Sequence, residues 1–460
     1  MPRQWPRVTA SRPAALAAGG GPVIGLSKEK RSIVCFWRGQ AEAALRVLIL
    51  AGQHGDERPA RRVLQSLLAQ APEEVAARFA ALRLAVIPEA NPDGCAIRSR
   101  CNADGIDLNR DHQLLRSGEA TAIHLFVRRW QPHIILDLHS YPSRRRHLLE
   151  RNVVLDHDVF IDVPNHPAIL ARPGSIDGAQ VLGGLLDTIS AHGVRAGRYT
   201  IIGASGRARH STTDVVDGRN GLALRYGAFT ILVENRQPRR CEGSSERLRL
   251  RTAQEQALSS VLEWLDQNHR LFASIAPVPP PPGSPVPVHF KYADTAHGLD
   301  LVCRDAQHGR PACVTFPRYS ASLVVRRAVS LPIGYAVPSG LVELKTVLRR
   351  HGFFSTHCRA GEVCWVEKLR IERARPSRRP NRPARRVVLV THRTKMDLDR
   401  YEVFPTRQSG GDALAVFLEP ESKHGLHRFS EMGLPLEAPS WYPVLRLAAG
   451  DSLAQKLGRL

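Results

Sequence analysis

Four short, almost unbroken apolar runs constrain most strongly how this chain can fold. They are separated by longer segments in which apolar residues recur every three or four positions, a spacing typical of amphipathic helices. Strands that are apolar throughout are usually buried on both faces of a parallel sheet, with the intervening helices packed over those faces. The sequence therefore predicts an α/β domain with a mixed, largely parallel central sheet flanked by helices. The runs are RVLILAG (46–52), LRLAVIP (82–88), HIILDLH (133–139) and FTILVEN (229–235).

A proline-rich segment, APVPPPPGSPVP at 276–287, marks the expected end of this domain. Prolines at this density fit neither a helix nor a central strand and favour an extended linker. Beyond it, short strand candidates alternate with Gly, Pro and charged turns, which predicts a smaller β-rich domain with one helix near 339–350. We therefore expect a tail at 1–22, the α/β domain at 23–275, the linker at 276–287 and an accessory domain at 288–460.

The formal net charge of +22 raises the question of a nucleic-acid partner. However, most of the basic residues are arginines spread through most segments of the chain, so they form no binding stripe. The densest cluster, RIERARPSRRPNRPARR at 370–386, is interrupted by prolines. This pattern favours a solvated loop, with a site for an acidic partner as the alternative. We expect no nucleic-acid partner.

The cysteines and the amino terminus bear on the cellular compartment. None of the eight cysteines shows the two-residue spacing of a zinc ribbon or redox motif, which favours free thiols in a reducing compartment. Cys303 with Cys313, and Cys358 with Cys364, are close enough in sequence to pair if the chain is exported. The basic amino terminus has only AALAA as an apolar stretch, shorter than the roughly 7–15 residues of a signal-peptide core. No segment has the roughly 18 apolar residues of a membrane span, so we expect a cytoplasmic protein.

Four side chains of metal-ligand or base type lie at the ends of the predicted strands. His54 and Glu57 follow the first strand, His139 ends the third and Glu234 ends the fourth. The carboxyl ends of parallel strands meet at one edge of a sheet, where ligands usually bind. Two imidazoles and a carboxylate are a known ligand set for catalytic zinc. We predict that His54, Glu57 and His139 bind one Zn²⁺ and that Glu234 is the general base for water at the metal. Taken singly, each side chain could instead have an ordinary structural role.

The segment IPEANPDGCAIRSRCNADGIDLNRDH at 87–112 makes the pattern specific. With the flanking residues it resembles the zinc carboxypeptidase family, the metallocarboxypeptidases related to pancreatic carboxypeptidase A. Members carry an HxxE pair, NPDG, an Arg followed two residues later by Asn, GxDLNR, a strand-end His and a strand-end Glu. The resemblance covers roughly residues 23–270 and includes GLSKEKRSI at 25–33, which is similar to the opening of many bacterial members. The matching residues are His54–Glu57, Asn91–Gly94, Arg100 with Asn102, Gly105–Arg110, His139 and Glu234.

The resemblance implies a catalytic domain at 23–275 with one zinc ion on the His54–Glu57–His139 triad. It also implies that Glu234 acts as general base and acid and that Arg100 stabilises the oxyanion. Asn109 and Arg110 match the pair that grips the free carboxylate of the substrate, for which a planar guanidinium is well suited. The expected reaction is hydrolysis of a carboxyl-terminal peptide or isopeptide bond. An ion pair of Arg110 with Asp107 or Asp111 is the structural alternative.

One departure limits what the resemblance implies about specificity. Digestive members place a mobile Tyr about two dozen residues before the catalytic Glu, whereas the stretch at 207–227 contains only Tyr226, which lies too near the strand. The digestive specificity and its loop gating are therefore not implied. Candidate pocket residues in this stretch, each with an ordinary loop role as the alternative, are His210, Asp214, Arg219 and Asn220.

Two other classes of function remain open from the sequence. Deacylases resembling succinylglutamate desuccinylase and aspartoacylase share the HxxE pair, the DLNR string and a distant His, and they cleave small N-acyl amino acids. The NPDG and DGIDLNR strings favour the peptidase over this branch. A non-catalytic binding module would need a broken triad or a missing Glu, and neither is seen. The segments at 331–352, 401–422 and 442–447 look like the carboxyl-terminal regions of larger bacterial members, which implies a module that shapes the cleft or simply stabilises the chain.

Overall fold

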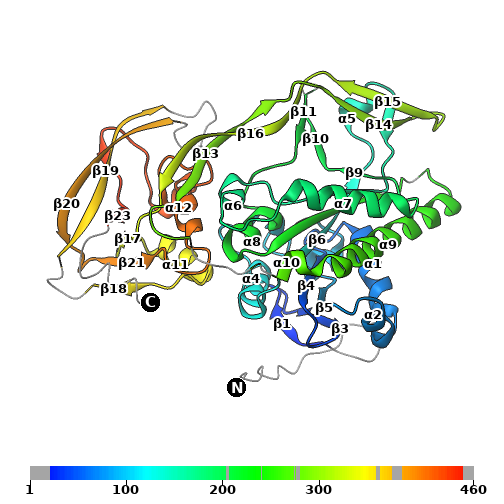
Figure 1. Ribbon diagram of the computed structural model, residues 1–460, viewed down its shortest axis with the longest axis horizontal. Coiled ribbons are helices and arrows are strands. Elements are labelled where there is room, and N and C mark those ends of the chain that lie inside the picture. The colour runs from blue at the N-terminus through cyan, green and yellow to red at the C-terminus, as the bar shows by residue number, and fades with distance from the viewer. Residues whose placement is uncertain are drawn as a thin grey trace.

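A computed structural model describes residues 21–203, 207–239, 241–273, 275, 280–358, 363–375 and 386–448. Three sequence predictions lie partly outside these residues. They concern the tail at 1–20, the linker at 276–279 and the centre of the arginine cluster at 376–385. Figure 1 shows an α/β unit built from the first part of the chain and a second, β-rich unit beside it, with a long two-stranded arm between them.

The centre of the α/β unit is a seven-stranded sheet in the order β3-β5-β4-β6-β12-β8-β9. Its four middle strands are mutually parallel and coincide with the four apolar runs, while β3 pairs antiparallel with β5 and β8 pairs antiparallel with β12 and parallel with β9. The predicted mixed, largely parallel sheet is therefore confirmed. The strands are β3 (Phe36–Gly39), β4 (Leu45–Ala51), β5 (Leu82–Ile87), β6 (Ile134–Pro142), β8 (Val159–Asp162), β9 (Ala196–Arg198) and β12 (Phe229–Gln237).

Helices cover both faces of this sheet because alternate strand side chains point to opposite sides. Val47 and Ile49 of β4 face a core shared with α1 (Arg58–Ala69), α7 (Gly178–Ala191) and α9 (Ser244–Gln267). Leu48 and Leu50 face the other core, which includes α4 (Gly118–Trp130) and α8 (Gly218–Tyr226). The segments between the apolar runs, whose spacing is typical of amphipathic helices, form α1, α4 and α7. Shorter elements of this unit are β1 (Val23–Leu26), β2 (Ser32–Val34), α2 (Pro72–Arg78), α3 (Pro92–Ile97), the 3-10 turn Leu108–Arg110, α5 (Arg146–Leu149), α6 (Pro167–Leu170) and α10 (His269–Ala273).

The strands that follow the proline-rich segment join sheets with strands that precede it. The arm consists of β13 (Pro285–Asp294) and β16 (Tyr319–Ser330), and β16 pairs in parallel with β11 (Ala208–His210). Beyond the arm, β14 (Leu299–Asp305) pairs with β7 (Val153–Leu155) and with β15 (Pro311–Phe316). The short strand β10 (Thr200–Ile202) completes the β11 edge. The division into domains at 276–287 stays a prediction, and β13 begins inside that segment.

The carboxyl-terminal unit is the β-rich region that the sequence predicted. Its main sheet is antiparallel, and α11 lies where one helix was expected. α12 was not expected, because all seven of its residues are buried and it shows no polar face. The elements are β17 (Gly334–Pro338), α11 (Val342–Arg350), β18 (Thr356–His357), β19 (Val363–Arg375), β20 (Arg386–Asp397), β21 (Tyr401–Pro405), α12 (Asp412–Leu418), 3-10 turns at Leu426–Arg428 and Ser430–Met432, β22 (Ser440–Trp441) and β23 (Leu445–Leu447).

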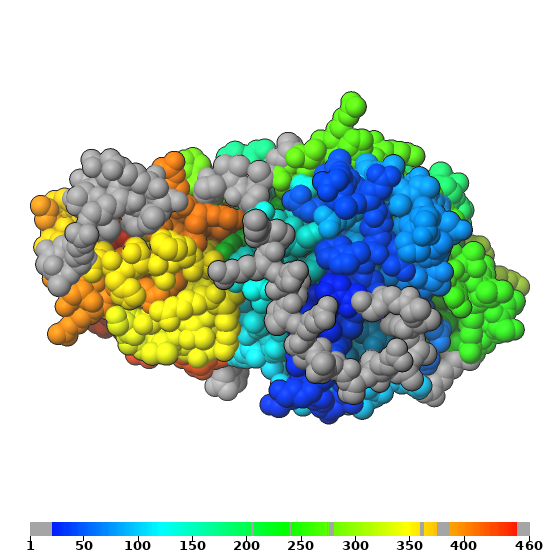
Figure 2. Space-filling view, turned by 90° about the horizontal axis from the view of Figure 1, so that it is seen from below, coloured from blue at the N-terminus to red at the C-terminus, as the bar shows by residue number. Residues whose placement is uncertain are grey.

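The two units share a buried core and lie side by side along the long axis of the molecule (Figure 2). Leu114 and Leu224 from the α/β unit pack into the same apolar cluster as Leu348 and Phe417 from the second unit. The β-rich unit is thus packed firmly against the α/β unit.

The cysteines and the helices bear on the expectations about compartment and membrane. Cys303 and Cys313 form no disulfide, so the first of the two alternative pairings is not present. In the β14–β15 register Cys303 stands opposite Ala312 instead. Within the part of the chain that the structure describes, no helix combines the length and apolar character that crossing a membrane requires.

Candidate metal centre

The structure brings His54, Glu57 and His139 together at one edge of the central sheet. His54 and Glu57 lie in the loop between β4 and α1, and His139 lies in the adjacent strand β6. All three side chains are buried, and one donor atom from each lies within 4.8 Å of the others. Nδ1 of His54 is 2.7 Å from Oε1 of Glu57, and Nδ1 of His139 is 3.0 Å from Oε2. The predicted convergence of these groups into a metal-binding triad is confirmed.

The second nitrogen of each imidazole contacts a carboxylate. His54 Nε2 is 3.0 Å from Oδ1 of Asp107, and His139 Nε2 is 3.1 Å from Oδ1 of Asp137. Metal-binding histidines usually donate their other N–H to such a group, which fixes the tautomer and turns the free lone pair toward the ion. The donor set and its orientation therefore fit a metal ion. Sequence reasoning assigned no role here to Asp107 or Asp137, although both lie within motifs that it used, DLNR and ILDLH.

Both supporting carboxylates stay ionised. Burial raises the pKa of Asp107, but the hydrogen bond from His54 and the charges of His54 and Arg100 bring it well below its usual range. Burial likewise raises the pKa of Asp137, and the neighbouring His139 brings it below the ordinary value. An ionised carboxylate can only accept a hydrogen bond, so with a metal ion on Nδ1 each imidazole would carry its hydrogen on Nε2 and donate it to Asp107 or Asp137.

The NPDG string holds the loop that carries His54. The side chain of Asn91 accepts a hydrogen bond from the Gly94 N–H at 2.9 Å and so caps α3, while its amide donates to the carbonyl of Gln53 at 3.2 Å. The backbones of Gly55 and Gly94 touch so closely that a Cβ on Gly55 would overlap the Gly94 carbonyl group. Small residues and a cap at these positions thus let the α3 turn support the metal-binding loop.

Glu234 lies beside the triad on the next strand. In the parallel pairing of β6 with β12 it stands directly opposite His139. Burial raises the pKa of its carboxyl group to about 7, with His139 lowering it and Glu57 raising it. A carboxyl group with such a pKa can take up and release a proton near neutral pH.

Three further predicted residues lie around the triad. Nε of Arg100 is 2.9 Å from Oδ2 of Asp107, and its Nη1 is 3.8 Å from Oε1 of Glu57. Nδ2 of Asn109 is 3.1 Å from Nε2 of His139, and Oδ1 of Asn109 accepts the Gly218 N–H at 2.8 Å. Arg110 is exposed, and among the described residues it donates only to the carbonyl of Asn109, at 2.6 Å. The alternative ion pairs of Arg110 with Asp107 or Asp111 are not formed, because Asp107 pairs with Arg100 and Asp111 accepts hydrogen bonds from Arg116 and Ser117.

The alternative pocket candidates belong mainly to a buried network around Asp162. His210 Nε2 is 2.9 Å from Asp162, and the guanidinium of Arg219 pairs with the same carboxylate. The Asn220 side chain accepts hydrogen bonds from the backbone N–H groups of Asn165 and His166 at 3.1 and 3.2 Å. Oδ1 of Asp214 is 3.4 Å from Nδ1 of His424 in the second unit. These contacts support an ordinary structural role for these residues.

Two residues that interact with Glu234 were not predicted as site residues from the sequence. Tyr199 lies between β9 and β10, and its pKa is raised by burial first and then by the charge of Glu234. Arg145, just before α5, interacts electrostatically with both Glu234 and Tyr199. No local pattern marks either residue, because the long connections that carry them are brought to Glu234 only by the tertiary fold.

A buried chain of hydrogen bonds leads from Asp137 away from the triad. Gln53 Nε2 is 2.7 Å from Asp137, and Gln53 Oε1 is 2.7 Å from His112 Nε2. His112 Nδ1 is 3.1 Å from His124 Nε2. His124 Nδ1 is in turn 3.0 Å from the Tyr226 hydroxyl. Burial lowers the pKa of His112 to about 4 and that of His124 well below its usual value, so both rings are neutral. Because Asp137 can only accept, each hydrogen bond in this series has one direction. The Tyr226 hydroxyl donates to His124, His124 donates to His112, His112 donates to Gln53, and the Gln53 amide donates to Asp137. The chain thereby holds Asp137 in place behind His139.

Comparison with solved structures gives several matches at low sequence identity. A metallo-carboxypeptidase from Burkholderia cenocepacia is 16% identical, with 54% of this chain and 64% of that chain covered and a TM-score of 0.40. A metallo-carboxypeptidase from Pseudomonas aeruginosa in complex with (2-guanidinoethylmercapto)succinic acid is 19% identical, with the same coverage and TM-score. The murein-tripeptide amidase MpaA from Escherichia coli O157 is 19% identical, with 56% and 98% covered and a TM-score of 0.35.

Comparisons of sequence give two kinds of match. Residues 43–160 match the model of the succinylglutamate desuccinylase/aspartoacylase catalytic domain. Carboxypeptidase 2 of Trichophyton tonsurans is 27% identical over 210 residues, and the match covers 44% of this chain and 38% of the relative. The probable carboxypeptidase 2 of Trichophyton verrucosum is 27% identical over 187 residues, with 39% and 36% covered. The chain thus spans little more than a third of the length of these relatives, and over that part its resemblance to the metallocarboxypeptidases is confirmed.

Proposed function

We propose that this chain is a zinc-dependent carboxypeptidase that hydrolyses a carboxyl-terminal peptide or isopeptide bond. The observation that carries the proposal is the buried His54–Glu57–His139 triad, with its donor atoms within 4.8 Å of one another. Two imidazoles and one carboxylate with an open fourth position are a known zinc set in peptidases. The similarity to fungal carboxypeptidases adds support.

Each of the predicted site residues has a separate role in the proposed reaction. Zinc held by the triad would polarise the scissile carbonyl and make water more acidic. Glu234 takes the proton of the attacking water and passes it to the leaving amine, a role that suits its pKa of about 7. Arg100 lies beside Glu57 and steadies the negative charge that develops on the carbonyl oxygen.

Arg110 is the residue best placed to bind the terminal carboxylate of the substrate. Its guanidinium is exposed and has no carboxylate partner among the residues that the structure describes. It follows Asn109, which contacts His139, so a carboxylate bound by Arg110 would lie near the metal-binding triad. A planar guanidinium can bind both oxygens of a carboxylate at once.

A second candidate is a deacylase that removes the acyl group of an N-acyl amino acid. The match of residues 43–160 to the succinylglutamate desuccinylase/aspartoacylase model favours it. The same triad, Glu234 and Arg110 would serve, because an N-acyl amino acid also carries a free carboxylate beside its amide bond. A non-catalytic binding module is not favoured, since the metal-binding triad is complete and Glu234 lies beside it.

Metal analysis combined with a substrate profile tests the proposal. We expect one zinc per chain and higher kcat/KM on amino-terminally blocked dipeptides than on N-acetyl- or N-succinyl-amino acids. The His139→Ala variant serves as the control that removes a ligand, and it should lose both zinc and activity. A preference for the N-acyl amino acids would establish the deacylase instead. A purified chain that binds no divalent metal would contradict both candidates.

A further inference from the structure

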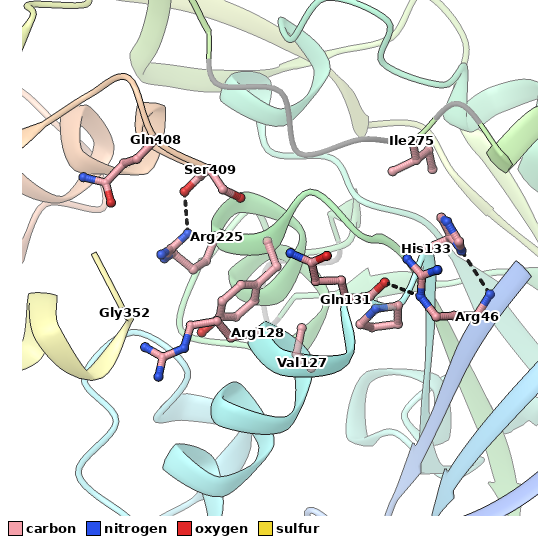
Figure 3. A pocket seen from close by; sticks show the side chains of 12 residues that line it. Arg46, Val127, Arg128, Gln131, His133, Arg225, Ile275, Gly352, Gln408 and Ser409 are labelled. Atoms are coloured by element: carbon pink, nitrogen blue, oxygen red, sulfur yellow. Dashed lines mark hydrogen bonds between the residues drawn. The ribbon is translucent and has the colours of Figure 1, made fainter. Parts of the chain in front are cut away.

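A cavity lies at the opposite edge of the central sheet from the metal centre. It has a volume of about 290 Å³ and sits where β4 and β6 begin, whereas His54 and His139 lie toward the other ends of these strands. Figure 3 shows it between the α/β unit and the second unit, which contributes Gly352, Gln408 and Ser409. None of the residues proposed for hydrolysis lines it.

The lining of this cavity is cationic. Arg46, Arg128 and Arg225 contribute guanidinium groups and His133 an imidazole, and the described lining residues include no carboxylate. In Figure 3, Arg225 and Arg128 lie on one side of the cavity and Arg46 and His133 on the other. Positive charges that lie close together without a counter-ion repel one another, so an anion bound in the cavity would be stabilised by this lining.

Arg225 is a buried cation whose hydrogen bonds go to neutral groups. Its side chain is 3% exposed. It donates to the carbonyls of His351 at 3.0 Å and Ser409 at 2.7 Å. Burial lowers the pKa of Arg225 to about 10, with Tyr226 and Asp412 raising it and the charges of Arg128 and Arg172 lowering it, so it remains charged at neutral pH. A charge withdrawn from water is costly unless an opposite charge compensates it.

Two further donors are available to a ligand. Arg128 is exposed and forms no hydrogen bond or ion pair with the described residues, and it lies against Gly352, where a Cβ would overlap its guanidinium. Nδ1 of His133 accepts the backbone N–H of Arg46 at 3.0 Å. Burial lowers the pKa of His133 to about 4, so the ring is neutral and carries its hydrogen on Nε2. That N–H has no partner among the residues described.

We propose that this cavity binds a small molecule with two anionic groups, carboxylate or phosphate. One group would bind between Arg128 and Arg225, and the other at Arg46 and His133. The planar guanidinium matches both anions, and the volume is near the lower end of pockets for small ligands. This site is separate from the proposed hydrolytic function and does not rest on it.

Calorimetric titration of the full chain tests the inference. The probes are succinate and pyrophosphate, with succinamide as the uncharged counterpart of succinate. At least one of the two anions should bind, and succinamide should not. The Arg128→Glu variant should weaken that binding by at least about tenfold, the scale of one charge-assisted hydrogen bond. Arg326→Glu is the matched control, because Arg326 is an exposed residue of β16 outside the cavity and the change in net charge is the same.

Each outcome of this comparison decides the inference. Succinate binding alone would assign a dicarboxylate, and pyrophosphate binding alone would assign a phosphate ligand. No binding of either succinate or pyrophosphate at millimolar concentration, or equal weakening by Arg128→Glu and Arg326→Glu, would overturn the site. Binding that is lost in Arg110→Ala but kept in Arg128→Glu would place the dianion at the proposed substrate site and would also overturn it. The hydrolysis assay is scored independently of these titrations.

Discussion

Glu234 and His139 face each other on neighbouring parallel strands, so the proposed base and one proposed ligand are positioned by the same backbone pairing. The Glu234→Gln variant keeps the size of the side chain but cannot accept a proton. We expect turnover to fall by roughly 10²–10⁴-fold, the usual contribution of a general base. Bound metal should be unchanged, because Glu234 is not part of the triad. Steady-state kinetics and metal analysis of the same preparation measure both effects.

The matched control for this variant is Glu74→Gln. Glu74 is exposed on α2 and far in sequence from every proposed site residue, so activity should be retained. If Glu234→Gln hydrolyses substrate at the parental rate, another group must act as the base.

Arg110 provides a test of substrate recognition at a single residue. Removing its guanidinium in Arg110→Ala should lower kcat/KM for substrates with a free terminal carboxylate by roughly 10–100-fold, the scale of losing a hydrogen bond to a charged group. Substrates with an amidated terminus should be affected little, because they carry no charge for Arg110 to bind. Paired assays on the acid and the amide of one peptide measure the difference. Equal losses on both would argue against a carboxylate clamp.

At the scale of elements, the packing of α3 against the metal-binding loop predicts a specific sensitivity. A Cβ on Gly55 would overlap the backbone of Gly94, so Gly55→Ala must push the loop with His54 and Glu57 away from α3. We expect this variant to lose metal affinity and to unfold at lower temperature. Gly183→Ala is the control, since Gly183 lies in α7 with open space around it and should gain about 0.5–1 kcal/mol of helix stability. Metal titration and thermal unfolding distinguish the two, and normal metal binding by Gly55→Ala would show that the loop can shift without cost.

The same elements show why part of the fold could be predicted and part could not. β4 and β6 were predicted because unbroken apolar runs are typical of strands that are buried on both faces. Since His54 and His139 follow or end these strands, they were expected to lie at the same edge of the sheet. α8 and α12 were missed because most of their residues are buried, so no polar face marks a helical period. The pairing of β14 with β7 joins segments about 150 residues apart, and no local pattern records such a contact. Asp107 and Asp137 were visible in the sequence, but their support of the imidazoles depends on side-chain geometry.

At the scale of the whole molecule, the second unit is connected to the loop that follows the DLNR string. The Gln113 side chain donates to the carbonyl of His424 at 2.5 Å, and Nε2 of His351 donates to the carbonyl of Gln113 at 2.9 Å. Arg172 pairs with Asp412 at 2.7 Å across the same boundary. These contacts place the second unit behind the residues that follow Arg110, so it can stabilise that loop. Whether it also shapes the cleft stays a prediction.

This boundary should weaken in acid because it contains a buried neutral histidine. Burial lowers the pKa of His351 to about 3, with the nearby Arg225 acting in the same direction, whereas an unfolded histidine has a pKa of about 6.5. Above pH 6.5 neither state binds a proton here, so the full stability is present. As the pH falls from 6.5 toward 3, only the unfolded chain takes up the proton, and the free energy of unfolding drops by about 1.4 kcal/mol per pH unit for this one group.

His351→Gln should therefore flatten the dependence of stability on pH. Glutamine can still donate to the Gln113 carbonyl but does not titrate, so the variant should lose less stability than the wild type between pH 7 and pH 4.5. Phe353→Leu is the control, because the buried Phe353 ring lies beside the His351 ring and replacing it takes away no titratable group. Urea unfolding at several pH values measures the slopes. Phe353→Leu should be less stable at every pH with the wild-type slope, whereas a wild-type slope in His351→Gln would show that other groups control the acid sensitivity of the boundary.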